Sequence, residues 1–162
     1  MTATSTKLSC KLALIAIAGV LAVMAGCNTQ SDISGGGKGQ ITSISVKHEG
    51  CVKPCPVFDV TLSRNGSATY VGKDQARFTG TFHGRVSDDD FERLAGIAYE
   101  KNLMSAGDVF HAPGADVGET VEVIVVSAGR KKTIKRDGPP GPDDLSQLIQ
   151  AVDGVADKID WK

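Results

Sequence analysis

The sequence lacks two features that would place the protein in a broad class. Its longest apolar run, residues 12–26, is about 15 residues long, whereas a helix that crosses a bilayer needs roughly 20. It also lacks a surplus of basic charge. The formal net charge is −1, and it falls to −3 without residues 1–26, which hold two lysines and no acid. A membrane-spanning helix and a general nucleic-acid binder are both disfavoured.

The sequence also lacks the common catalytic motifs. It contains no Gly-x-Ser-x-Gly, no His-Glu-x-x-His and no Walker phosphate-binding loop. His83 falls on the outward phase of an expected strand, where a solvated histidine is the ordinary case. His111 lies in the longest loop, which we interpret as an ordinary loop rather than the wall of a pocket. We therefore predict a protein that is not an enzyme and uses no cofactor.

The first 26 residues are typical of a bacterial signal peptide, with two lysines before the apolar run and small residues at its end. The ending Ala25-Gly26-Cys27 resembles the lipobox of bacterial lipoproteins, with Met24 where leucine is usual. That resemblance implies cleavage before Cys27 and attachment of fatty acyl chains such as palmitate to it, so that the membrane is the expected partner. Asn28 is not the aspartate associated with inner-membrane retention, so we expect the outer membrane, facing the periplasm.

Two further segments complete the expected organisation. Residues 27–40 are rich in glycine and polar side chains without periodicity, and they predict a lipidated cysteine followed by a flexible tether with a reach of roughly 20 Å. Residues 41–162 suffice for one domain and are too few for two.

Apolar periodicity predicts the fold of this domain. Asn65-Gly66 and Ala128-Gly129 indicate tight hairpins, and helices are expected from a Ser87 cap and after Pro142. The result is an α+β domain, order β-β-β-β-α-β-β-α, in which two helices cover one face of an antiparallel sheet of about six strands. Alternation places these strands at residues 41–48, 57–63, 67–71, 77–86, 121–126 and 131–136.

Cys51 and Cys55 are the two cysteines left once Cys10 is removed with the signal and Cys27 is lipidated. In an oxidising envelope, a pair this close is most simply a disulfide. The loop that it would close is short, so its expected contribution to stability is only about 2 kcal/mol. A metal or redox site is the alternative.

Residues around these cysteines follow a recurring pattern, in which the main matches are Cys51-x3-Cys55-Pro56-Val57-Phe58, Val60-Thr61-Leu62, Asn65-Gly66-Ser67-Ala68-Thr69-Tyr70, Gly80, Phe91 and Leu94. Weaker matches are Asp116, Gly138-Pro139-Pro140 and Trp161. The pattern resembles the bacterial domain of unknown function numbered 6438, found largely in small exported lipoproteins. The resemblance covers about the whole mature domain. It implies a fold and an envelope location, and it implies no chemistry.

The spacing Cys-x3-Cys-Pro also resembles the copper-binding loop of thioredoxin-fold chaperones. Thiolates and imidazole suit Cu(I), and His48 is the nearest histidine that could join Cys51 and Cys55 as a ligand. In that fold a helix follows the cysteines, whereas here residues 57–62 alternate as a strand does. We therefore keep copper binding or thiol redox chemistry as the alternative function.

Five basic residues cluster on the last predicted hairpin. Charged edge strands commonly block sheet-to-sheet aggregation, and this is the interpretation that we favour. The functional alternative is a patch for an anionic partner in the envelope, such as a protein, lipid headgroups or an acidic glycan. The residues concerned are Arg130, Lys131, Lys132, Lys135 and Arg136.

Overall fold

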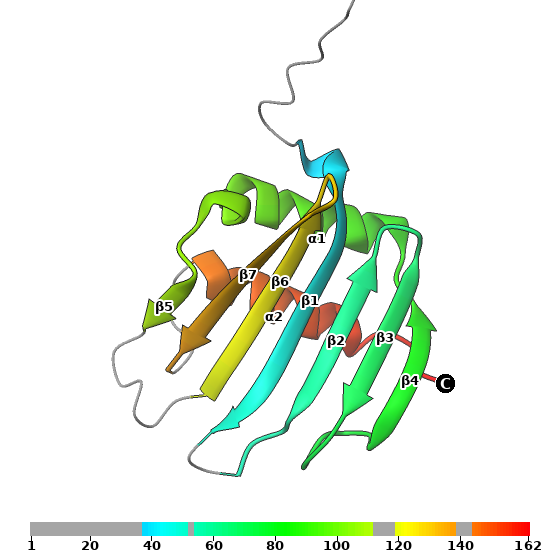
Figure 1. The fold of residues 1–162 in the computed structure, drawn as a ribbon. Coiled ribbons are helices and arrows are strands. Elements are labelled where there is room, and N and C mark those ends of the chain that lie inside the picture. The colour runs from blue at the N-terminus through cyan, green and yellow to red at the C-terminus, as the bar shows by residue number, and fades with distance from the viewer. Residues whose placement is uncertain (1–36, 52–53, 112–118, 139–143) are drawn as a thin grey trace, which may run out of the picture. The chain divides into compact units, whose positions relative to one another are not determined.

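A computed structural model describes residues 37–51, 54–111, 119–138 and 144–162, with the backbone alone for Cys51. Within these ranges, a seven-stranded sheet has the order β4-β3-β2-β1-β6-β7-β5 (Figure 1). The strands are β1 Ile41–Cys51, β2 Phe58–Ser63, β3 Ser67–Gly72, β4 Gly80–Arg85, β5 Val109–His111, β6 Glu119–Ser127 and β7 Arg130–Asp137. The helices are α1 Asp88–Glu100 and α2 Asp144–Ala156, with 3-10 turns η1 Lys38–Gln40 and η2 Leu103–Ser105.

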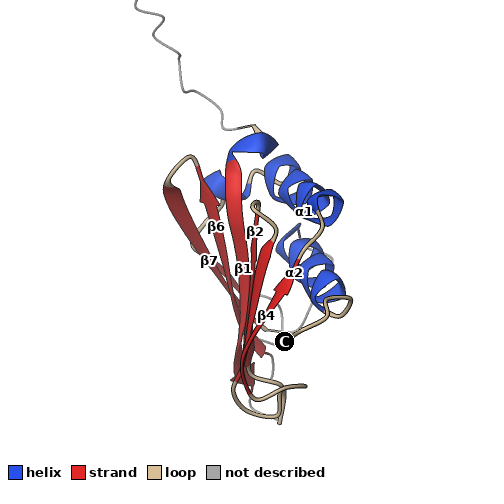
Figure 2. Ribbon diagram, turned by 90° about the vertical axis from the view of Figure 1, so that its right-hand side faces the viewer, coloured by secondary structure: helices blue, strands red, loops and turns tan. Residues whose placement is uncertain are grey.

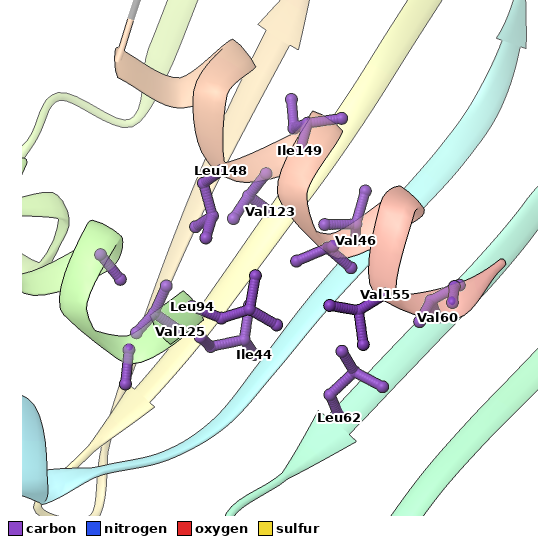
Figure 3. Close-up of a cluster of buried hydrophobic side chains, with 14 of the residues drawn as sticks. Ile44, Val46, Val60, Leu62, Leu94, Val123, Val125, Leu148, Ile149 and Val155 are labelled. Atoms are coloured by element: carbon purple, nitrogen blue, oxygen red, sulfur yellow. The ribbon is translucent and has the colours of Figure 1, made fainter. Parts of the chain in front are cut away.

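Both α-helices lie on one face of the sheet, and the core fills the space between them and the strands (Figures 2 and 3). Alternation along the central strand β1 sends Ile44 and Val46 to this face, where both are fully buried. The backbone register places Val46 beside Val60 of β2 and Val123 of β6. No helix in the described stretches is both long and apolar enough to cross a membrane.

The predicted α+β layout is confirmed, but the sheet differs from the prediction in two respects. It is mixed rather than antiparallel, because β5 pairs in parallel with β7 at Val109 and Lys135. This strand has three residues, too few to show periodicity, and it lies in a segment that we predicted to be a loop. The fourth strand is also shorter than predicted, because the chain bends at residues 77 and 78 and the strand begins only at Gly80, which has a positive φ of 115°.

The two predicted hairpins form through different turns. Ala128 and Gly129 both have positive φ, at 49° and 75°, as a two-residue type I′ turn requires. At the other hairpin, Gly66 has φ of 82° but Asn65 does not have positive φ, so the expected pair of left-handed residues is corrected to one. The loop there spans residues 64–66, and glycine supplies its left-handed position.

Helix α1 begins as predicted. The Ser87 hydroxyl accepts a hydrogen bond from the Asp90 amide at 3.1 Å, and three acidic residues occupy the first turn. Each helix buries a stripe of apolar residues at helical spacing, and the half-buried Ile159 lies beyond the end of α2. The buried residues of these stripes include Phe91, Leu94, Ala95, Ala98, Leu145, Leu148, Ile149 and Val152.

The last residues of the predicted tether have regular structure. Lys38–Gln40 form η1, so the ordered chain begins before residue 41. The Arg64 side chain donates to the carbonyl oxygens of Ile41 at 2.6 Å and Lys38 at 2.9 Å. The amide of Ala128, at the tip of the β6–β7 hairpin, donates to the carbonyl of Gln40 at 3.1 Å. These bonds hold η1 against both hairpins.

Candidate functional site

His48 occupies an unusual place for a histidine, in the apolar layer between the sheet and α2. It follows Ile44 and Val46 on the inward phase of β1, and 6% of its surface is exposed. Its ring stacks on that of Phe58 from β2, with 4.3 Å between the ring centroids. A polar group that is buried this deeply needs hydrogen-bond partners.

Two carboxylates provide them. His48 Nδ1 lies 2.5 Å from Glu119 Oε1, at the start of β6, and His48 Nε2 lies 3.1 Å from Asp153 Oδ1 on α2. The carboxylate side chains are 23% and 32% exposed, so water reaches them while the ring is shielded. We call His48, Glu119 and Asp153 the histidine clamp, because they join β1, β6 and α2.

The clamp favours the charged form of His48. Burial alone would lower its pKa, but the hydrogen bonds to Asp153 and Glu119, together with their negative charges, outweigh burial and raise the pKa to about 9. At neutral pH both ring nitrogens therefore donate hydrogen bonds. A histidine in this state has no free lone pair with which to accept a proton or bind a metal.

This geometry bears on the copper alternative. For His48 to bind Cu(I) with Cys51 and Cys55, its ring would have to lose a proton and give up a carboxylate partner. In the described ranges, no three His, Cys, Asp or Glu side chains are arranged so that they could hold a metal ion. Cys55 is half-buried. The side chain of Cys51 lies outside the described residues, so the Cys51–Cys55 pairing stays a prediction.

Sequence reasoning missed Glu119 and Asp153 as partners of His48. They are separated from it by 71 and 105 positions, and no local pattern connects them. One signal was available, since His48 continues the inward alternation of Ile44 and Val46 and an inward histidine requires partners. Cys27 and residues 1–26 also lie outside the described residues.

The structure divides the basic hairpin between two faces, so the predicted patch is narrower than expected. Arg136 follows Ile134 on the inner face of β7, is 1% exposed and donates from Nη1 to the Gly138 carbonyl at 2.9 Å. It is not a surface residue, because alternation along a strand sends every second side chain to the same face. Lys132 forms an ion pair with Asp108 at 2.5 Å.

Three basic residues of the hairpin remain exposed. Lys135 lies 3.9 Å from Glu49, whereas Arg130 and Lys131 are at the hairpin tip. The edge interpretation also needs correction, because β5 pairs with the second half of β7 and leaves only its first half as an edge. Binding of an anionic partner thus remains a prediction for the tip rather than for all five residues.

The other two histidines lie on the surface. His83 is exposed on β4, with Nδ1 3.5 Å from the Thr69 hydroxyl, in keeping with its outward phase. His111 is the last residue of β5, and its Nδ1 lies 3.6 Å from Asp137 Oδ2. Its side chain is 71% exposed, so a strand position replaces the predicted loop position without burying the ring.

A pocket of about 480 Å³ opens beside η1, at the end of the sheet opposite the clamp. We call it the tether-end pocket, because the described chain begins next to it. The last turn of α1, the turn that follows it, the first residue of β1 and the tip of the β6–β7 hairpin form its walls. Its lining comprises Ile41, Ala98, Tyr99, Glu100, Asn102, Met104, Ser105, Ser127 and Arg130.

Comparison with known families confirms the resemblance carried by the cysteine motif. Residues 42–156 match the family described as Domain of unknown function (DUF6438), a range that runs from β1 to the end of α2 and contains the whole histidine clamp. No curated protein matches the chain. Because the match covers well over half of the sequence, the protein belongs to the DUF6438 family.

Proposed function

We propose that the protein is a lipid-anchored protein of the bacterial cell envelope. The observation that carries this proposal is the apolar run that ends in Ala25-Gly26-Cys27. Regular structure begins at Lys38, close enough to Cys27 for a short tether to hold the domain near a membrane surface. Asn28 supports the outer membrane as that surface.

We further propose that the domain has a structural or binding role rather than a catalytic one. The histidine clamp supports this, because both ring nitrogens of His48 are engaged in hydrogen bonds, one to Glu119 on β6 and one to Asp153 on α2. General-base catalysis would instead require a nitrogen that can take a proton from a substrate. The exposed charges at the tether end are better placed to meet a partner.

The anchor is tested by replacing Cys27 with alanine in a bacterial host and labelling the cells with radioactive palmitate. The unaltered chain should incorporate label and yield a mature protein whose first residue is Cys27. Cys27→Ala should incorporate none and keep its signal peptide. Cys10→Ala is the matched control, since Cys10 would be lost with the signal and the mature mass should not change.

Separation of the two membranes on a density gradient tests the location. The unaltered protein should enter the outer-membrane fraction, and Asn28→Asp should move it to the inner membrane in an enterobacterial host. If Cys27→Ala incorporated palmitate, or if it were cleaved to a mature protein with the same first residue position and acylated mass as the unaltered chain, the anchor would lie at another residue. Equal distribution of both proteins between the membranes would contradict the assignment to the outer membrane alone.

A further inference from the structure

The tether-end pocket combines opposite charges with an apolar floor. Arg130 supplies a guanidinium group and Glu100 a carboxylate, and both residues are exposed. Ile41, which is 2% exposed, and the half-buried Met104 provide apolar surface beneath them. A volume of about 480 Å³ lies within the range of small-ligand sites, so the pocket has room for a compact ligand that carries both charges.

Tyr99 adds a second, independent feature. It is 52% exposed, one of two large hydrophobic side chains with this degree of exposure among the described residues. A tyrosine ring is apolar with a polar hydroxyl, and such rings are enriched where protein meets the headgroup region of a bilayer. Because Tyr99 lines the same pocket as Arg130, an aromatic and a cationic group occur together at this surface.

The pocket is also at the end of the domain that an anchor would hold near the membrane. Ile41 lines it, and the amide of Ala128 at the tip of the β6–β7 hairpin donates to the carbonyl of Gln40. Figure 1 shows this hairpin tip beside η1. Lys38 in η1 and Lys131, the residue after Arg130, are also exposed. If Cys27 carries lipid, as proposed above, the short tether keeps headgroups at a high local concentration, so a weak site would still be occupied.

We propose that the tether-end pocket binds the headgroup of an amine-bearing phospholipid. Arg130 binds the phosphate through its paired N–H donors, and Glu100 accepts hydrogen bonds from the ammonium group. Tyr99 lies at the level of the glycerol backbone. This inference rests on the proposed envelope location, and it gives the domain an orientation, with the histidine clamp facing away from the bilayer.

Vesicle flotation with the unlipidated mature chain, which starts at residue 27 and carries Cys27→Ala, tests the proposal. The chain should float with vesicles that contain phosphatidylethanolamine and phosphatidylcholine, and much less with phosphatidylcholine alone. Arg130→Glu should lower the partition coefficient at least about tenfold, because these vesicles carry no net charge and the substitution removes the charge-assisted hydrogen bonds to the headgroup phosphate. Glu100→Gln should remove the preference for phosphatidylethanolamine.

Arg77→Glu is the matched control, because Arg77 is a similarly exposed arginine in the β3–β4 connection, at the opposite end of the sheet (Figure 1). It should leave flotation unchanged. Equal flotation with both vesicle types, or equal loss in Arg77→Glu and Arg130→Glu, would overturn the proposal. Stronger binding to phosphatidylglycerol that Glu100→Gln does not alter would show simple charge attraction instead of headgroup recognition.

Inorganic phosphate distinguishes a lipid from a free anion as the ligand. At matched ionic strength, phosphate should not displace the chain from vesicles if the amine and the apolar floor contribute to binding. Complete displacement would identify a phosphate site and overturn the lipid assignment. These tests use a chain without lipid, so failure of the pocket proposal is separate from failure of the palmitate experiment.

Discussion

The charged side chains at the two ends of the sheet differ in burial and in pairing. At the clamp end, His48 is almost fully buried and each of its nitrogens faces a carboxylate. At the tether end, Arg130 and Glu100 are exposed on the lining of a pocket. Removing one partner of a buried ion pair is strongly destabilising, whereas exposed charges beside a cavity remain available to a ligand. We therefore expect the clamp end to stabilise the fold and propose the tether end as the binding site.

Removing the His48 side chain should have the largest effect on stability. His48→Ala leaves Glu119 and Asp153 without their shared cation and opens a cavity beside Phe58. We expect a loss of about 3 kcal/mol in the free energy of unfolding, or about 10 °C in melting temperature. Urea and thermal unfolding measure it. The exposed His83→Ala is the control, expected to change stability by less than about 0.5 kcal/mol.

A result within about 0.5 kcal/mol of the unaltered protein would show that the clamp is not a stabilising element. His48→Gln refines the test, because glutamine keeps one donor while it removes the charge. If His48→Gln is as unstable as His48→Ala, the charge accounts for the effect. If it recovers most of the stability, hydrogen bonding and packing account for it.

Raising the pH should reduce the stability that the histidine clamp contributes, without any substitution. The pKa of His48 is about 9 in the folded chain against 6.5 unfolded, so the folded state binds its proton more tightly. The resulting stability is fully present below pH 6.5 and is lost as the pH rises through 9, about 3 kcal/mol in all. Unfolding in urea from pH 6 to 10 should show this loss relative to His48→Gln. Parallel pH profiles for the two proteins would refute it.

The parts of the fold that sequence predicted are those in which burial sets a period. Phe91, Leu94 and Ala98 repeat at helical spacing, and Ile44 and Val46 at strand spacing, because each set covers one face. Strand β5 was missed because backbone bonds to β7, rather than a side-chain pattern, define its three residues. The clamp was missed because its carboxylates lie 71 and 105 positions from His48 in the sequence, and only the tertiary fold brings them together.

The alternation of side chains along a strand also indicated which charged residues point inward, although a cluster of basic residues suggested a surface patch. Arg136 was predicted to belong to a basic surface because it follows other cations in the chain. Its phase, two residues after the buried Ile134, places it on the inner face instead. The same reasoning applies to His48 after Val46. A charged side chain on the inward phase of a strand therefore indicates an internal partner before it indicates a binding patch.

Replacing both cysteines should have a smaller effect than breaking the clamp. Cys51→Ser with Cys55→Ser should lower stability by about 2 kcal/mol, because a short loop gains little from closure, and the domain should still fold. Thiol titration of the purified mature protein should find the pair oxidised. The comparison predicts that His48→Gln does not alter this redox state.

The copper alternative makes the opposite prediction at each step. It requires free thiols in protein taken from the periplasm, stabilisation of the reduced domain by Cu(I), and weakening of that stabilisation in His48→Ala. Finding all three would replace the structural role of the clamp end by metal binding. Oxidised cysteines with no effect of Cu(I) would leave the disulfide as the simpler account.

The smallest change in stability is expected at the tether end. Arg130 and Tyr99 are exposed, and Arg130 has no ion-pair partner among the described residues, so their side chains contribute little to the folded state. Arg130→Glu and Tyr99→Ala should each change the free energy of unfolding by less than about 0.5 kcal/mol. The same urea series that contains His48→Ala measures this change.

A loss of about 2 kcal/mol or more, on the scale of a buried contact, would contradict this prediction. It would mean that the pocket residues belong to the packed core, and that stability does not depend mainly on the clamp end. A small loss joined to reduced vesicle flotation would instead separate binding from stability in one pair of variants.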